Sequence, residues 1–364
     1  DPSHINQAVE KIKNSKQPII ISGGGVLYSE AEQELSKFAK KHNIPVTSTV
    51  MGIGCMTKDD PYYISAVGAL GEGSSNSLSK DTDLALAIGT KLADFTTGSW
   101  ANFENPNFKL VSVNTARYDT TKHLATPVIS DAKVGLQKIS EALGDWKAPD
   151  DWYKRAIKEK NEWDAYVEKQ SGPTNQEEPS YAHAVGAVYR NSDPSDIVVT
   201  AAGGLVGEVV QVWKPKQLNT FETEWGFSCM GYEISGALGI KMAKPDQDVV
   251  VFVGDGSYLL NNTDIYSSVI YDQKLIIIVC DNGGHMVINR LQLAKGGKEY
   301  ICNLRAARAT NLKFVDFENH AKSMGANAET VSSTSELEAA FKRAKDSDKT
   351  YVIAIKTHGY EWLK

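Results

Sequence analysis

The feature that most constrains the fold of this chain is a repeated alternation of short apolar runs with helical segments. In the first part of the sequence the runs end in Gly, Ser, Thr or Asn, which suit tight turns, and they cover residues 18–22, 45–49, 84–89, 110–114 and 127–130. Between the first two runs, Ala31, Leu35 and Phe38 have helical spacing. This alternation is typical of a parallel sheet covered by helices.

The same alternation starts again at Ser180. It predicts a helix over 181–189 and strands over 197–201, 249–253, 275–280 and 351–355. Between the halves, the sequence predicts a polar helix followed by a linker. We therefore expect an α/β protein with two doubly wound parallel-sheet domains joined by a linker. The boundaries would be a central α/β domain at 1–145, the helix and linker at 146–179, and a second α/β domain at 180–364.

Composition and charge exclude several classes of protein. The 364 residues include 39 Lys and Arg against 45 Asp and Glu, a net charge of −6, and 41% are hydrophobic, as in folded globular proteins. Because no run is rich in Lys and Arg, we expect no nucleic-acid partner. The longest apolar runs are far shorter than the ~18 to 20 residues that cross a bilayer, so we expect no membrane span.

The cysteines and the start of the chain give two further expectations. Cys55, Cys229, Cys280 and Cys302 form no CxxC pair and have no His at zinc spacing. We therefore expect a reducing, cytoplasmic compartment. The chain starts at Asp1 without Met and without a signal-peptide pattern, so we expect it to begin inside a longer gene product.

The most informative segment is Gly254-Asp255-Gly256-Ser257, which follows an apolar run directly. A second apolar run ends in Asp281-Asn282-Gly283-Gly284. The carboxyl ends of parallel strands face the ligand crevice, so Asp255 and Asn282 are expected at the same edge of the sheet. Glycines there let the backbone approach a phosphate, and a following helix, starting near Thr263, would add its N-terminal N–H groups.

A carboxylate that faces a phosphate requires a cation between the two. Mg²⁺ takes oxygen ligands and usually combines one or two protein carboxylates or amides with phosphate oxygens. We expect the metal ligands to be Asp255, the Asn282 side chain and a backbone carbonyl at Gly284. The alternative is that both segments are only turns. Their pairing, each after a buried strand with one helix between, favours the metal site.

These segments together resemble the signature of thiamine diphosphate-dependent enzymes, whose usual form ends in Asn-Asn where this chain has Asp281-Asn282. Residues 224–239 resemble the segment that holds the aminopyrimidine in the acetolactate-synthase-like members. The resemblance implies thiamine diphosphate and Mg²⁺ as cofactors. It implies that Met230 supports a bent cofactor, with a core methionine as the alternative, and that the Ser228 carbonyl accepts a hydrogen bond from it. The implied cofactor-binding residues are Ala202, Gly203, Ser228, Met230, Gly256, Ser257 and Asn282.

Within this superfamily, residues 225–233 and 285–292 are similar to the trihydroxycyclohexanedione hydrolases of myo-inositol breakdown. This implies hydrolysis of a C–C bond in a small cyclic polyol diketone. His285 and Asn289 would be the catalytic residues and Arg290 would help to line the pocket, unless His285 is only a loop residue and Arg290 a surface cation. An acetolactate-synthase-like carboligase or a 2-keto-acid decarboxylase is the alternative function.

The first half is similar to the central domain of the same family, which carries FAD in some members and nothing in others. Gly23-Gly24-Gly25 follows a strand, but GxGxxG would need glycine at Tyr28, so a structural turn is favoured over a ligand contact. Family members also carry a pyrimidine-binding domain with an activating glutamate, for which this chain has no counterpart. A non-catalytic cofactor-binding fragment is therefore a further alternative. The resemblance also implies a homodimer or homotetramer.

Overall fold

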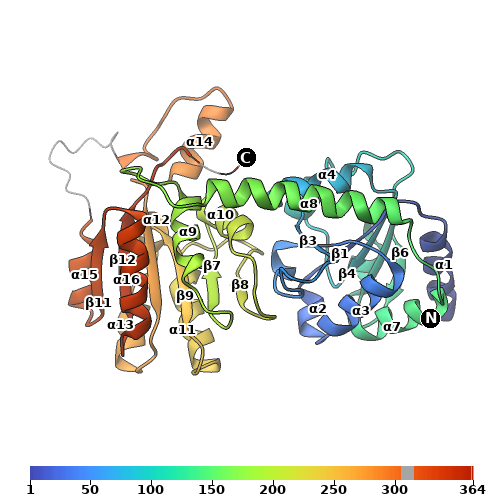
Figure 1. Ribbon diagram of the computed structural model, residues 1–364, viewed down its shortest axis with the longest axis horizontal. Helices are drawn as coiled ribbons and strands as arrows, with labels where there is room; N and C mark the ends of the chain where they lie inside the picture. Colours follow the sequence, from blue (N-terminus) through green and yellow to red (C-terminus); the bar gives the residue numbers. More distant parts are fainter. Residues whose placement is uncertain (305–314, 362, 364) are drawn as a thin grey trace. The chain divides into compact units, whose positions relative to one another are not determined.

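The computed structural model describes residues 1–304, 315–361 and 363. The chain divides into two compact units (Figure 1). Unit 1 is Asp1–Tyr166 with Lys214–Asn219, and unit 2 is Val167–Trp213 with Thr220–Lys364. Each unit holds a six-stranded sheet of parallel strands covered by helices, which confirms the predicted α/β fold of two doubly wound domains. The division falls inside helix α8 (Asp150–Gln170), and the domain boundaries at 145 and 180 stay predictions.

The sheet of unit 1 has the order β3-β2-β1-β4-β5-β6. Its strands are β1 (Pro18–Ser22), β2 (Val46–Ser48), β3 (Tyr63–Ala66), β4 (Leu84–Ile88), β5 (Lys109–Asn114) and β6 (Thr126–Ile129). One face is covered by α1 (Pro2–Lys13), α2 (Gly24–Tyr28), α3 (Glu32–His42) and α7 (Ala132–Leu143), and the other by α4 (Gly73–Asp81) and the first part of α8. Short helices at strand ends are η1 (Val50–Gly52), α5 (Asp94–Thr97), α6 (Arg117–Thr121) and η2 (Lys122–Leu124).

The glycines after β1 meet the loop after β4, where the strand order of unit 1 reverses. A Cβ added to Gly23 would lie 2.4 Å from the Gly89 carbonyl oxygen, and one added to Gly25 would lie 2.6 Å from the Gly89 Cα. Only residues without a side chain allow two loops to approach this closely. Gly24 and Gly25 begin helix α2 instead of forming the predicted turn, and the close contact with Gly89 gives these glycines a structural role.

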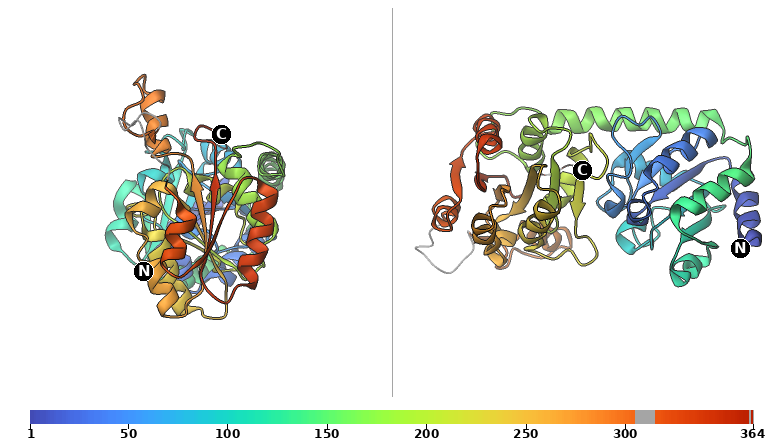
Figure 2. Two further views of the ribbon diagram at one scale, coloured as in Figure 1. Left: turned by 90° about the vertical axis from the view of Figure 1, so that its left-hand side faces the viewer. Right: turned by 90° about the horizontal axis from the view of Figure 1, so that it is seen from below.

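The sheet of unit 2 has the order β11-β12-β10-β9-β7-β8. Its strands are β7 (Ile197–Thr200), β8 (Phe221–Thr223), β9 (Val249–Gly254), β10 (Ile276–Asp281), β11 (Asn327–Val331) and β12 (Tyr351–Lys356). Figures 1 and 2 show this sheet between two layers of helices. One layer is α9 (Tyr181–Arg190), α10 (Leu205–Val212) and α16 (Thr334–Asp346); the other is α11 (Tyr232–Ala243), α13 (Asp264–Ile270) and α15 (Phe317–Ser323). Two more helices, α12 (Asp255–Leu260) and α14 (Met286–Ala294), follow the ends of β9 and β10.

The central strands of unit 2 are continuous apolar runs because both faces of the sheet are buried. In β9, Val249, Val251 and Val253 pack in one cluster with Ile234 of α11 and other helical residues on that side. Phe252 points to the opposite face, where its ring lies 6.0 Å from the ring of Trp213. Packing on both faces fixes the strand ends, and so fixes where Asp255 and Asn282 emerge.

Some local expectations differ from the structure. Strands β3, β8 and β11 were not predicted, and a helix begins at Asp255 itself, ahead of the helix expected near Thr263. The four cysteines are free thiols, of which Cys55 and Cys280 are buried. Within residues 1–304, 315–361 and 363, no helix is long and apolar enough to cross a membrane.

Candidate functional site

A cavity of 240 Å³ lies at the carboxyl ends of the central strands of unit 2. Strands β7 and β9 are neighbours in the sheet but not in the chain, because the strand order reverses between them. In open α/β sheets ligands bind at this kind of crevice. The cavity is lined by every predicted cofactor and metal residue, and by one of the two predicted catalytic residues: Ala202, Gly203, Ser228, Met230, Asp255, Gly256, Ser257, Asn282, Gly284 and His285.

Asp255 and Asn282 emerge side by side from two paired strands. In the parallel pairing of β9 and β10, Gly254 lies opposite Cys280, so the residues that follow share one edge of the sheet. The Asp255 side chain is only 4% exposed, and its Oδ2 accepts a hydrogen bond of 2.7 Å from the Gly284 N–H. The Asn282 Oδ1 is buried and has no hydrogen-bond partner among the residues that the structure describes. Such an oxygen is available to a cation, which fits the predicted magnesium site.

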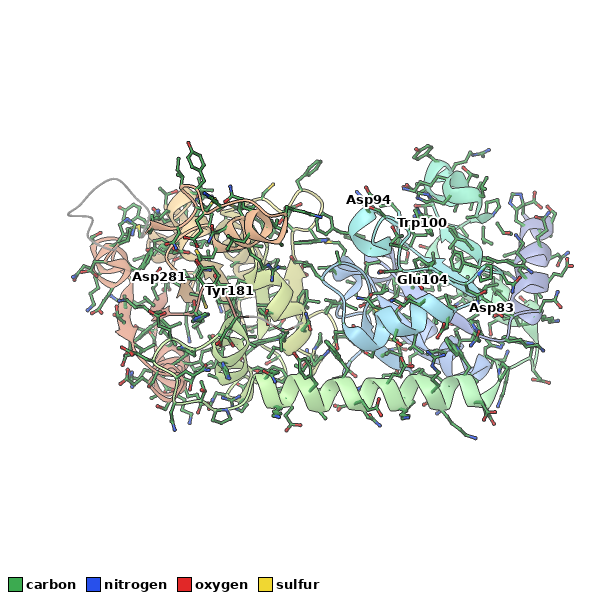
Figure 3. All side chains as sticks on the ribbon, turned by 90° about the horizontal axis from the view of Figure 1, so that it is seen from above. Asp83, Asp94, Trp100, Glu104, Tyr181 and Asp281 are labelled. Carbon is green, nitrogen blue, oxygen red and sulfur yellow. The ribbon has the colours of Figure 1, made fainter. Side chains whose placement is uncertain are left out.

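The orientation of the Asn282 amide is set by Tyr181, the first residue of α9. The Asn282 Nδ2 donates to the Tyr181 hydroxyl at 2.5 Å. Burial raises the pKa of that hydroxyl, and the nearby charges of Asp255 and Asp281 add to the effect; Tyr181 and Asp281 are labelled in Figure 3. The phenol therefore stays protonated and accepts the amide hydrogen with its oxygen.

The buried Asp255 carboxylate lies close enough to a second acidic side chain, Asp281, to be repelled by it. Burial raises the pKa of the Asp255 carboxyl to about 7, and repulsion from Asp281 acts in the same direction. A bound divalent cation would offset both effects. In the described part of the chain, no three His, Cys, Asp or Glu side chains converge to hold a metal. The candidate ligands are therefore a carboxylate, an amide and a backbone carbonyl, a set of hard oxygen donors that suits Mg²⁺.

Hydrogen bonds to the Glu224 side chain stabilise the loop that carries Ser228 and Met230. The two oxygens of this carboxylate accept hydrogen bonds from the N–H groups of Phe227 at 2.8 Å and Cys229 at 2.7 Å. Ser228, between them, has a φ of +55°, a left-handed conformation that is uncommon for a residue with a side chain. Met230 lines the cavity and is 36% exposed, so it is not packed into the core.

His285 and Met230 flank Gly256. A Cβ added to Gly256 would lie 2.8 Å from the His285 Cε1 and 3.4 Å from the Met230 Cε. A side chain at this position would therefore have to displace the imidazole. The glycine after Asp255 keeps open the part of the cavity where His285 approaches the backbone.

Asn289 and Arg290 lie outside the residues that line the cavity. The Asn289 side chain is fully buried, and its Nδ2 donates to the Glu299 Oε1 at 2.8 Å and to the Tyr360 hydroxyl at 3.2 Å. Arg290 interacts with the carboxylate of Glu208. Helix α14 begins at Met286, so residues 286–288 form the first turn over the cavity and the next two side chains face other elements. The structure thus brings His285, but not Asn289, to the site.

Two residues of the site were not identified from the sequence. Tyr181 forms a hydrogen bond with Asn282, which lies 101 positions later in the sequence, and no local sequence pattern predicts such a contact. Glu233 is 1% exposed and accepts hydrogen bonds from the N–H groups of Ala202 and Gly231. A carboxylate within the mostly apolar stretch 230–240 was the one available signal for its burial.

Comparison with known proteins assigns both units to one family. Residues 5–139 match the model described as thiamine pyrophosphate enzyme, central domain, and residues 201–355 match the C-terminal TPP binding domain. The chain belongs to the thiamine pyrophosphate enzymes. Thiamine pyrophosphate is another name for thiamine diphosphate, so the family recognised from the motifs is confirmed. Apart from Tyr181, the residues that line the cavity of this thiamine pyrophosphate enzyme fall within the matched C-terminal domain.

Three similar curated proteins carry the name 3D-(3,5/4)-trihydroxycyclohexane-1,2-dione hydrolase. The protein from Geobacillus thermodenitrificans is 33% identical over 392 residues, covering 98% of this chain and 61% of the relative. The protein from Clostridium tetani is 34% identical over 393 residues, with the same coverage. The protein from Bacillus licheniformis is 33% identical over 386 residues, covering 97% of this chain and 60% of the relative. The chain thus spans about three fifths of the length of these relatives.

Proposed function

We propose that this protein takes part in a thiamine diphosphate- and Mg²⁺-dependent hydrolysis of a C–C bond in a cyclic 1,2-diketone of the trihydroxycyclohexanedione type. The observation that carries the proposal is the pairing of Asp255 with the unpartnered Asn282 Oδ1 in one cavity of a thiamine pyrophosphate-binding domain. The substrate class is supported by the name of the relatives, whose similarity extends over 97–98% of this chain.

The metal would be held by Asp255, the Asn282 Oδ1 and the Gly284 carbonyl. The bound cation would neutralise the cofactor's diphosphate, which would otherwise be repelled by Asp255 and Asp281. The loop at Ala202 and Gly203 and the residue Ser257 line the same cavity and would contact the diphosphate. No side chain stands in front of the Gly203 Cα, since a Cβ added there would meet nothing within 4 Å.

The loop of residues 228–230 would hold the remainder of the cofactor. Met230, exposed towards the cavity, would support the bent conformation, and the Ser228 carbonyl would accept a hydrogen bond from the aminopyrimidine. When bound, thiamine diphosphate supplies a nucleophilic carbon and an electron sink for C–C bond cleavage. The role of the protein residues would be to orient this group.

We assign acid–base chemistry to His285. Its ring lines the cavity beside Gly256, and an imidazole can serve as a general acid or base when it is within reach of a substrate. In this position it would hold or release a proton at a substrate oxygen. Asn289, the other predicted catalytic residue, would act only by holding α14, because its side chain is bonded to Glu299 and Tyr360 outside the cavity.

The remaining parts of the proposal concern the setting of the reaction. We propose a small-molecule substrate, no nucleic-acid partner, a cytoplasmic location and a homodimer or homotetramer. The acidic net charge of −6 supports the absence of a nucleic-acid partner. Light scattering of the purified full-length protein would measure the number of subunits, and a monomer would contradict the proposed assembly.

Product analysis tests the proposed function. The full-length protein would be incubated with thiamine diphosphate, Mg²⁺ and trihydroxycyclohexane-1,2-dione, and the mixture followed by NMR. The proposal predicts one open-chain acid and no CO₂. A parallel incubation with a 2-keto acid in place of the dione tests the alternatives: release of CO₂ with formation of an aldehyde would support a decarboxylase, and joining of two keto acids a carboligase. Cofactor binding without any of these reactions would support the cofactor-binding fragment.

A further inference from the structure

The carboxylate of Glu233 joins three segments that line the cavity, although Glu233 is not itself among the lining residues. Its Oε1 accepts a hydrogen bond of 3.2 Å from the Ala202 N–H, in the loop after β7. Its Oε2 accepts one of 2.8 Å from the Gly231 N–H, next to Met230. The Ser257 hydroxyl, in the segment after Asp255, hydrogen-bonds to the same carboxylate.

A buried carboxylate is costly unless hydrogen bonds compensate its charge. Burial raises the pKa of the Glu233 carboxyl, and the hydrogen bonds from Ala202, Gly231 and Ser257 act in the opposite direction. Bonds from neutral donors to a charged acceptor are about twice as strong as those between neutral groups. Each of the three segments is therefore held by one common acceptor, and a shift of any segment would leave part of the buried charge unpaired.

Capping of α11 explains only part of this arrangement. Gly231 is the N-cap residue of α11, so a carboxylate that accepts its N–H stabilises the start of that helix. The bond from Ala202 is different, because it comes from a loop 31 positions away that follows another strand. The stability of α11 does not depend on the bond from the Ala202 N–H. The position of the Ala202 loop in the cavity does depend on it.

We propose that Glu233 is a positioning residue that holds the Ala202 loop, the Met230 loop and Ser257 in the arrangement that binds thiamine diphosphate. This inference rests on the proposed function. It assigns to Glu233 no contact with the cofactor. The side chain acts through the backbone N–H groups that it orders, much as an outer-shell group orders the ligands of a metal.

The test uses Glu233→Gln in the full-length protein. Glutamine has the same size but only one acceptor oxygen, so one of the two backbone N–H groups would face an NH₂ group. The matched control is Glu208→Gln, on α10. Glu208 is also a buried carboxylate, 3% exposed, but it accepts the N–H of Leu363 outside the cavity. Isothermal titration calorimetry would give the dissociation constant of thiamine diphosphate in saturating Mg²⁺, and thermal unfolding without ligand would give the stability.

The account predicts that Glu233→Gln binds the cofactor about tenfold more weakly or worse, the effect of losing one charge-assisted hydrogen bond, while Glu208→Gln binds as the wild type does. Wild-type affinity in Glu233→Gln would overturn the inference. If Glu233→Gln does not fold, the same titration is made with Glu233→Asp. This variant keeps the charge but is too short to reach both N–H groups, so it should also bind the cofactor more weakly, and wild-type affinity would overturn the inference. A wild-type protein that binds no cofactor would contradict the proposed function instead.

Discussion

The side-chain amide of Asn282 donates a hydrogen bond of 2.5 Å to the Tyr181 hydroxyl, and its buried oxygen has no partner in the described part of the chain. The tyrosine thus determines which end of the amide is available to a ligand. Groups that orient a metal ligand in this way usually influence metal affinity strongly without touching the ion. The contact links the start of α9 to the loop after β10, so the candidate metal site depends on the tertiary fold of unit 2.

Tyr181→Phe should weaken Mg²⁺ binding by about 10- to 100-fold, because the Asn282 amide loses the partner that orients it. The measurement is a Mg²⁺ titration in saturating thiamine diphosphate. Tyr351→Phe is the matched control, since the Tyr351 hydroxyl donates to Glu329 at 2.7 Å between β12 and β11. Equal Mg²⁺ affinity in the two variants would show that the Tyr181 contact does not orient a ligand.

Gly256→Ala should impair cofactor binding, because the new Cβ would lie 2.8 Å from the His285 ring. The control is Gly239→Ala in α11, where an added Cβ would meet nothing within 4 Å. That substitution should raise the free energy of unfolding by roughly 0.5–1 kcal/mol through helix propensity and leave binding unchanged. Both variants would be compared by calorimetry and thermal unfolding. The prediction fails if Gly256→Ala binds the cofactor normally.

Met230→Ala should reduce activity more than stability. Met230 is 36% exposed, so truncation would cost roughly 1–2 kcal/mol of folding free energy. Because Met230 is proposed to bend the cofactor, the rise in the activation free energy calculated from kcat should be well beyond the loss of folding free energy. Thermal unfolding and steady-state kinetics would be measured on the same preparation. Parallel losses of activity and stability would favour a packing role for Met230.

The pH dependence of stability should report on Glu208. Burial raises the pKa of its carboxyl from 4.5 to about 8. Because the folded state favours the protonated form, the contribution of this group to stability is complete below pH 4.5 and is lost as the pH rises through about 8. Glu208→Gln carries no charge and keeps an acceptor for Leu363. The melting temperature of this variant, relative to that of the wild type, should therefore rise as the pH increases from about 5 to about 9. Melting curves that stay parallel across this range would contradict the assignment.

The strand ends that build the site could be predicted from the sequence. The runs before Asp255 and Asp281 are apolar throughout because both faces of the sheet are covered, and parallel pairing then brings Asp255 and Asn282 to one edge. Strands β8 and β11 could not be recognised in this way. Strand β8 has three residues, and β11 is an edge strand that includes Asn327, Glu329 and Thr330, so neither forms an apolar run.

Other features of the site depend on contacts that no local pattern encodes. The bonds of Glu233 to Ala202 and of Asn282 to Tyr181 each join segments that are distant in sequence. Asn289 was expected in the pocket because it follows the metal loop, yet its amide faces Glu299 and Tyr360. Which face of a short helix meets a cavity depends on how the surrounding elements pack, which the sequence of that helix alone does not specify.

Asp255 is proposed to hold a Mg²⁺ ion that in turn holds thiamine diphosphate. The most direct measurement is calorimetric titration of thiamine diphosphate into metal-free protein, with and without Mg²⁺, for the wild type and Asp255→Ala. We expect tight binding only for the wild type with Mg²⁺, because the substitution removes the charged member of the proposed ligand set. Wild-type affinity in Asp255→Ala, or equal affinity of the wild type with and without Mg²⁺, would contradict this proposal.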